Sequence, residues 1–110
     1  MNEDPADLLQ GTVDVLILRT LAWKATHGYA MTQFLRDRSK GDLELSGAAL
    51  YQALHRLERR RLIRSHWGTS EANRRVRVYE LTARGREELV TASDNWRRYA
   101  AAVSRVLAPA

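Results

Sequence analysis

The periodicity of apolar residues changes along this chain, and that change limits the folds it can adopt. Up to about residue 60, apolar side chains recur every three to four residues, as in amphipathic helices. Two short segments rich in Ile, Val, Trp and Tyr follow, Leu62–Trp67 and Val76–Leu81, and both read as β-strands. Helical spacing returns after Thr82. The pattern predicts helices, one hairpin and a closing helix, and 110 residues suit one core.

Three helices are expected before the hairpin, after a polar and flexible segment at residues 1–7. The first runs from Leu8 or Leu9 to about Trp23, the second from about Tyr29 to Arg38, and the third from Ser46 to about Arg60. Ser46 is a good N-cap, because its hydroxyl can accept a hydrogen bond from the backbone amides of the first helical turn.

The third helix has two faces of different chemistry. At 100° per residue, its apolar side chains share one face: Leu50, Ala53, Leu54 and Leu57. The opposite face is small at its start, hydrogen-bonding in its middle and cationic at its end, with Ala48, Gln52, His55 and Arg59 on it and Tyr51 and Arg56 on its flanks. We expect the first face to anchor the helix and the second to meet a partner.

The positive charge of the chain is concentrated in one window. Residues 55–77 hold eight arginines and two glutamates, a net charge of +6, whereas the whole chain carries +5. The window covers the end of the third helix and the predicted hairpin, whose loop, Gly68–Arg75, ends in two arginines. A directed positive surface most commonly meets a polyphosphate backbone.

Together these features predict a mainly α protein with a small β-hairpin: a winged helix-turn-helix at residues 8–82, followed by a C-terminal dimerisation helix at residues 83–110. In such folds the start of one helix enters the major groove of double-stranded DNA, and the hairpin, or wing, lies along the backbone or the minor groove. Gln52 can pair with adenine, and Ala48 or Tyr51 can contact a thymine methyl. The predicted DNA-binding residues are Tyr29, Ser46, Ala48, Tyr51, Gln52, His55, Arg56, Arg59, Arg60, Arg74, Arg75 and Arg77.

Other interpretations of this surface are open at this point. A charged helix face is often only solvated. A winged helix can also be a protein-docking module, although a docking surface usually exposes apolar residues rather than Gln52, His55 and Arg59. RNA fits less well, because its deep, narrow major groove excludes an α-helix and no aromatic stacking platform is evident.

The final helix, expected from about Ala83 to Leu107 with Thr82 as its N-cap, carries an apolar seam. Its spacings alternate between three and four residues, as in a coiled coil, at Leu89, Ala92, Trp96, Tyr99, Val103 and Val106. The seam can cover the body of its own chain or pair with a second copy. A helix this long would project beyond so small a body, so we expect a homodimer on an inverted-repeat operator.

The residue types argue against catalysis and against a metal or cofactor. There is no cysteine, which excludes disulfides, thiolate zinc sites and a cysteine nucleophile. His27, His55 and His66 lie on three different elements and lack metal-ligand spacing. No catalytic serine–histidine–acid arrangement or phosphate-binding glycine loop is recognisable. Since no apolar run is long enough for a membrane span and the N-terminus is acidic, we expect a non-enzymatic cytoplasmic protein.

Five segments resemble one protein family. They are Leu8-Leu9-Gln10-Gly11-Thr12-Val13-Asp14, His27-Gly28-Tyr29, Leu50-Tyr51-Gln52-Ala53-Leu54-His55-Arg56-Leu57-Glu58, Trp67-Gly68-Thr69-Ser70-Glu71 and Tyr79-Glu80-Leu81-Thr82-Ala83-Arg84-Gly85. The combination resembles the PadR family of bacterial transcriptional regulators, and the short final helix resembles its compact subfamily with a single C-terminal dimerisation helix. The resemblance implies a homodimeric repressor on a palindromic operator, with Ser46–Arg60 as recognition helix, Gly68–Arg77 as wing and Ala83–Leu107 as dimerisation helix.

Two residues depart from the family pattern. Gln52 stands where the family usually has proline, and it adds a side chain that can read bases, so the operator of a relative need not be the operator of this chain. Arg61 stands where family members often have glycine. If that position is left-handed, arginine strains it by about 1 kcal/mol.

The resemblance also points to a small aromatic effector. Family members that bind flat aromatic compounds do so at the dimer interface, where Trp96 and Tyr99 would lie. Two copies of Trp96 near a two-fold axis could stack on a planar ligand. The alternative is that the indoles simply pack against each other.

Overall fold

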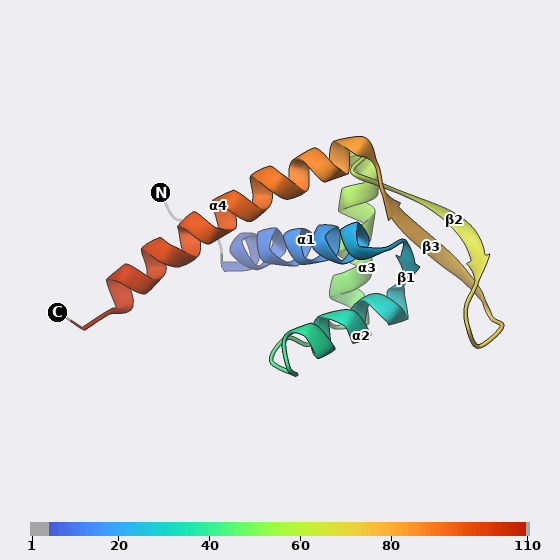
Figure 1. Ribbon diagram of the computed structural model, residues 1–110, viewed down its shortest axis with the longest axis horizontal. Helices are drawn as coiled ribbons and strands as arrows, with labels where there is room; N and C mark the ends of the chain where they lie inside the picture. The colour runs from blue at the N-terminus through green and yellow to red at the C-terminus, as the bar shows by residue number, and fades with distance from the viewer. Residues whose placement is uncertain (1–4, 110) are drawn as a thin grey trace.

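The computed structural model describes residues 5–109, with side chains from residue 11 onward (Figure 1). Its elements are, in order, α1 (Pro5–Trp23), β1 (Thr26–His27), α2 (Gly28–Arg38), α3 (Gly47–Arg59), β2 (Ile63–Thr69), β3 (Arg75–Leu81) and α4 (Ala83–Leu107). Helices dominate and a small antiparallel sheet completes a winged helix-turn-helix. The predicted fold class is therefore confirmed.

The first helix is longer than predicted. α1 begins at Pro5, three residues before the expected start at Leu8, so the segment predicted to be flexible overlaps the helix at residues 5–7. Proline is well tolerated in the first turn of a helix, because its missing N–H would have no helical partner there. The rest of that predicted segment, residues 1–4, lies outside the described residues.

The sheet has a third strand that the sequence did not predict. β1 pairs with β3 at Thr26↔Tyr79 and His27↔Val78, and the strand order is β1-β3-β2. A strand of two residues leaves no alternating pattern to detect. The strand attaches the base of the wing to the connection between α1 and α2.

The apolar face of α3 lies at the centre of the core. Its predicted residues Leu50, Ala53, Leu54 and Leu57 are all buried. They belong to one cluster with residues from α1, α2 and the sheet, including Ile17, Leu18, Leu21, Met31, Ile63, Tyr79 and Leu81. Because α3 is held from several sides, its opposite face has a fixed orientation toward solvent.

The C-terminal end of α3 is closed by a Schellman motif. The Leu62 N–H donates to the Leu57 carbonyl at 3.0 Å, and the Arg61 N–H donates to the Glu58 carbonyl at 2.9 Å. This geometry requires a left-handed residue after the C-cap Arg60, and Arg61 has φ +61°. Glycine adopts this conformation without a steric penalty, whereas arginine is strained in it.

Replacing Arg61 by glycine is therefore expected to stabilise the fold by about 1 kcal/mol. Arg61→Ala is the matched control, because it removes the same exposed side chain and charge but keeps the Cβ that causes the strain. Urea denaturation of both variants at one protein concentration measures the difference. Equal midpoints for the two variants would show that the left-handed position is not strained.

The start of α4 is attached directly to the end of α3. Thr82 caps α4 by accepting from the Gly85 N–H at 3.0 Å, as predicted, and its hydroxyl donates to the Arg61 carbonyl at 2.8 Å. From this junction α4 runs back along α1 and extends beyond it at its C-terminal end (Figure 1). Within residues 5–109, no helix combines the length and hydropathy needed to span a membrane.

Candidate nucleic-acid interface

The start of α3 presents an exposed polar face. Ser46 is the N-cap, as predicted, and its hydroxyl accepts from the Ala49 N–H at 3.1 Å. The side chains predicted to face a partner are exposed to solvent: Ala48, Tyr51, Gln52, His55 and Arg59. A regular helix whose opposite face is buried can offer such a surface to a groove without rearranging.

Arg56 has a different place from the one predicted. Its Nη2 donates to Asp14 Oδ1 on α1 at 2.7 Å, and the two side chains are only 23% and 18% exposed. The Nε atom of Arg56 is buried and has no hydrogen-bond partner. The prediction that Arg56 contacts DNA is not supported by this placement, because its guanidinium is already bound between α1 and α3.

Removing the charge of Asp14 should reveal this structural role. Asp14→Asn leaves Arg56 without its anion in a half-buried site, and we expect a loss of about 1–3 kcal/mol in the free energy of unfolding. The exposed pair of Arg36 and Glu44, at 3.5 Å, is the matched control, and Glu44→Gln should cost at most about 0.5 kcal/mol. Equal costs for the two variants would contradict a structural role for the Asp14–Arg56 pair.

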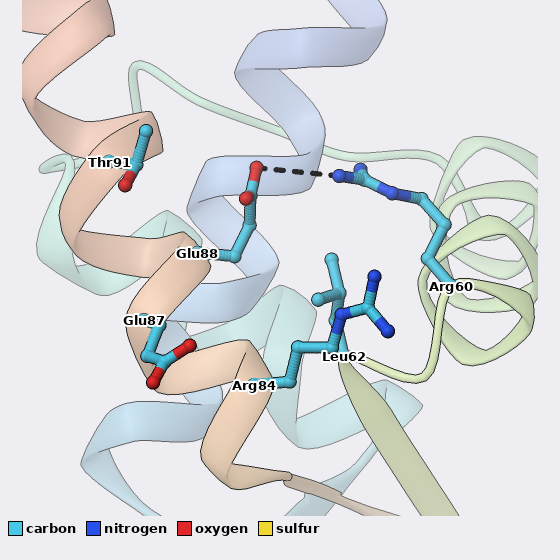
Figure 2. Close-up of a pocket in the computed structure, with 6 residues that line it drawn as sticks. All are labelled: Arg60, Leu62, Arg84, Glu87, Glu88 and Thr91. Carbon is cyan, nitrogen blue, oxygen red and sulfur yellow. Dashed lines mark hydrogen bonds and ion pairs between the residues drawn. The ribbon is translucent and has the colours of Figure 1, made fainter.

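Arg60 is also held by a carboxylate. Its Nη2 lies 3.4 Å from Glu88 Oε2 on α4, across a recess of about 240 Å³ (Figure 2). The other residues lining this recess are Leu62, Arg84, Glu87 and Thr91. Arg60 therefore faces the first turns of α4 (Figure 2), and as the C-cap it lies at the opposite end of α3 from the N-cap Ser46. Only Nη2 of Arg60 contacts Glu88 and the Arg60 side chain is 52% exposed, so its other N–H groups can still reach a phosphate.

The strands of the wing are longer, and its loop is shorter, than predicted. The pairing of β2 with β3 continues to Thr69↔Arg75, so the loop is residues 70–74, five residues rather than the eight expected. The Ser70 N–H donates to the Arg74 carbonyl at 2.8 Å, which closes the loop. Regular pairing extends almost to the tip because the loop supplies its own backbone hydrogen bonds.

The wing arginines are arranged around a tryptophan. Arg74, Arg75 and Arg77 are exposed, as required of phosphate-binding groups. The guanidinium carbon of Arg75 lies 4.2 Å from the centre of the Trp67 ring, and that of Arg77 lies 5.1 Å from it. Trp67 was predicted to end a strand and belongs to a segment of the family resemblance, but no role in binding was predicted for it. The strand register could have revealed its role, because Trp67 pairs directly with Arg77.

A hydrogen-bonded connection joins α3 to the wing. Arg77 Nε donates to Ser65 Oγ at 3.0 Å, and Ser65 Oγ donates to Glu58 Oε2 at 2.8 Å. Tyr79 lies beside Ser65 across the ladder. Burial raises the pKa of the Tyr79 phenol and the Glu58 carboxylate raises it further, so the phenol is neutral beside this connection.

The remaining predicted residues lie at the edge of this surface or away from it. Tyr29 is exposed in the first turn of α2, where its hydroxyl accepts from Gln33 Nε2 at 2.8 Å. His27 and His66 both pair with Val78, from opposite sides of β3. Among the described residues, no group of three His, Asp or Glu side chains could hold a metal ion.

An exposed polar helix beside a cationic two-stranded wing defines a winged helix-turn-helix protein of the DNA-binding class. The profile of the transcriptional regulator PadR-like family matches residues 17–91. The chain belongs to this family and is a DNA-binding transcriptional regulator.

Solved structures share this fold. A transcriptional regulator from Clostridium thermocellum is 24% identical, over 93% of this chain and 99% of that chain, with a TM-score of 0.82. A PadR family transcription regulator from hypervirulent Clostridium difficile R20291 is 28% identical, over 87% and 98%, with a TM-score of 0.71. A PadR-like transcription factor from Bacteroides fragilis is 21% identical, over 92% and 95%, with a TM-score of 0.73.

Proposed function

We propose that the protein is a repressor that binds an inverted-repeat operator as a homodimer. The observation that carries the proposal is the joint exposure of the outer face of α3 and the arginines of the wing. One element has the size and polarity to read a major groove, and the other has the charge to hold the adjacent backbone.

The two elements divide the work of recognition. The exposed face of α3 supplies sequence-reading groups, of which Gln52 has the amide that pairs with adenine N6 and N7. Arg59 and the wing arginines supply affinity for phosphate and for the minor groove, with little sequence information. Tyr29 and Ser46, which are also among the predicted DNA-binding residues, complete this interface. Arg60 can add a phosphate contact through the N–H groups that Glu88 does not engage.

The homodimer is supported by the exposure of the α4 seam. Leu89 packs against the core of its own chain. The N-terminal part of the seam therefore covers the body of its own chain, which is one of the two alternatives given for the seam. Farther along, the apolar residues Trp96, Tyr99, Val103, Val106 and Leu107 are exposed. Val106 is 83% exposed and Leu107 is 77% exposed. Contact of this apolar surface with water is unfavourable, and pairing with a second copy would bury it. A single C-terminal helix used in this way fits the compact PadR subfamily.

Repression follows from occupancy. A dimer on two half-sites about one helical turn apart covers the DNA between them and excludes RNA polymerase where the operator overlaps a promoter. A small planar aromatic compound is the proposed effector, bound by Trp96 and Tyr99 of both copies. Trp96 Nε1 donates to Thr12 Oγ1 on α1 at 3.2 Å, so a ligand that moved this indole would act on the α1–α4 contact.

The effector proposal is tested by fluorescence. A panel of planar aromatic compounds is titrated into the wild-type dimer and into Trp96→Ala, and saturable quenching is expected only in the wild type. Uniform quenching of both proteins, or none in a wild type that is still dimeric, would leave the alternative that the indoles simply pack together.

The operator proposal is tested by selecting bound duplexes from random DNA at about 150 mM salt and measuring the mass of the complex. The expected result is an inverted repeat bound by two chains. Salt-sensitive binding without a sequence motif would mean that the basic surface only holds DNA nonspecifically. No binding by a folded dimer would favour the alternative, a protein-docking module.

A further inference from the structure

The wing carries an aromatic platform that has no packing role in the core. Trp67 on β2 is 53% exposed, and the guanidinium groups of Arg75 and Arg77 from β3 lie 4.2 and 5.1 Å from the centre of its ring. All three side chains point to the same face of the ladder, because Trp67 pairs with Arg77 and Arg75 is two residues away on the same strand.

This platform is connected to the helix proposed to read the bases. Arg77 donates through Nε to Ser65 Oγ at 3.0 Å, and Ser65 donates to Glu58 on α3 at 2.8 Å. One edge of the Arg77 guanidinium group is therefore held by a hydrogen bond to Ser65, and the group also lies near the indole of Trp67. Its position relative to α3 depends on the indole and on this connection.

We propose that Trp67 is a positioning residue for DNA binding, which holds the guanidinium groups of Arg75 and Arg77 in place before the duplex arrives. The inference rests on the proposed operator binding by the wing. A stacked guanidinium keeps its in-plane N–H groups available, so it can stack on the indole and donate to a phosphate at the same time. A free arginine must instead give up its rotamer freedom when it binds.

The geometry of the wing also indicates which DNA sequences the two arginines favour. Two guanidinium groups presented on one face of a thin two-stranded ribbon fit a narrow minor groove, where the negative potential is strongest. Narrow minor grooves occur at A-tracts. Trp67 should therefore favour duplexes with A·T-rich sequence outside each half-site, at positions that no side chain of α3 reaches.

Substitution of Trp67 tests the proposal. Trp67→Leu removes the aromatic face and Trp67→Phe keeps one. We expect Trp67→Leu to weaken binding of the dimer to its selected operator by about tenfold and Trp67→Phe to recover most of that loss. The preference for A·T over G·C pairs in the flanking sequence should shrink in the same order. Trp23→Leu is the control, because Trp23 is 54% exposed and lies outside the wing.

A mutant cycle shows whether Trp67 acts through the arginines. In an Arg75→Ala/Arg77→Ala background, Trp67→Leu should change the dissociation constant by less than twofold, whereas a purely structural role would give the same loss in both backgrounds. In the free protein, Trp67→Leu should shift the side-chain proton resonances of Arg75 and Arg77, because the ring current disappears.

Each outcome separates this inference from the proposed function. If the wild type binds its operator and Trp67→Leu binds equally well with unchanged arginine resonances, the positioning role is wrong and the operator proposal stands. If the wild type binds no duplex while the resonances shift as expected, the stacking is real, and both the operator proposal and the DNA-positioning role fail.

Discussion

The double variant Arg74→Ala/Arg75→Ala is expected to bind the operator about 10²- to 10³-fold more weakly than the wild type at 0.1 M salt. The proposed homodimer has two wings, so the variant would remove four cationic groups from its interface with DNA. Each phosphate contact contributes about 0.9 to the slope of log affinity against log salt, and the slope should fall by about four. Fluorescence anisotropy with labelled operator between 50 and 200 mM salt measures both quantities.

Two control variants separate the effect of the wing from those of net charge and base reading. Arg84→Ala/Arg86→Ala makes the same change in net charge at the start of α4, and its salt slope should remain close to that of the wild type. Gln52→Ala should leave the slope unchanged while reducing the preference for the selected sequence by about 1–3 kcal/mol. An equal fall in slope for the Arg84→Ala/Arg86→Ala variant would mean that net charge, rather than the wing, drives binding.

Gly85→Ala is expected to cost about 3 kcal/mol or more in the free energy of unfolding. A Cβ at Gly85 would overlap the carbonyl oxygen of Leu62 and would lie 3.0 Å from the carbonyl carbon of the same residue and from Leu81 Cδ2. Backbone atoms cannot move aside by changing rotamer, so the junction between α3 and α4 would have to open.

Urea denaturation at a fixed protein concentration measures this cost. Gly47→Ala is the matched control, because Gly47 also lies in the first turn of a helix and a Cβ there would meet nothing within 4 Å. Its stability should stay within about 1 kcal/mol of the wild type, with any change toward higher stability. A Gly85→Ala protein as stable as Gly47→Ala would contradict the described contact with Leu62.

Elements with strong local signals could be predicted closely. The last helix has the predicted bounds, Ala83–Leu107, because Thr82 is a local capping residue and the apolar spacing is regular. β1 was missed because its two residues are extended only through their pairing with β3. The start of the first helix was missed by three residues, although Pro5 is a residue type that often begins a helix.

Only the part of the candidate site that lies on α3 could be predicted from the sequence. Helical periodicity identifies the exposed face of α3, but it cannot name the long-range partners of residues on its flanks. Arg56 pairs with Asp14, a residue 42 positions earlier, and Arg60 pairs with Glu88, 28 positions later. Two of the predicted DNA-binding arginines therefore contact carboxylates that no local pattern reveals. The Trp67 platform likewise depends on strand register.

The capped junction between α3 and α4 couples the orientation of α3 to that of the long helix α4. Thr82 and Gly85 join the two helices so closely that they should turn as one body. α4 has 25 residues and is about 37 Å long. In the proposed homodimer, a tilt of about 5° where the C-terminal half of α4 packs against its partner would move the opposite end of the helix, next to α3, by about 3 Å. That distance is close to the rise of one base pair, about 3.4 Å. The spacing of the two α3 helices on DNA would then be set by the angle at which the two copies of α4 cross. Sequence changes in the C-terminal half of α4 could therefore change the preferred operator spacing without altering a DNA-binding residue.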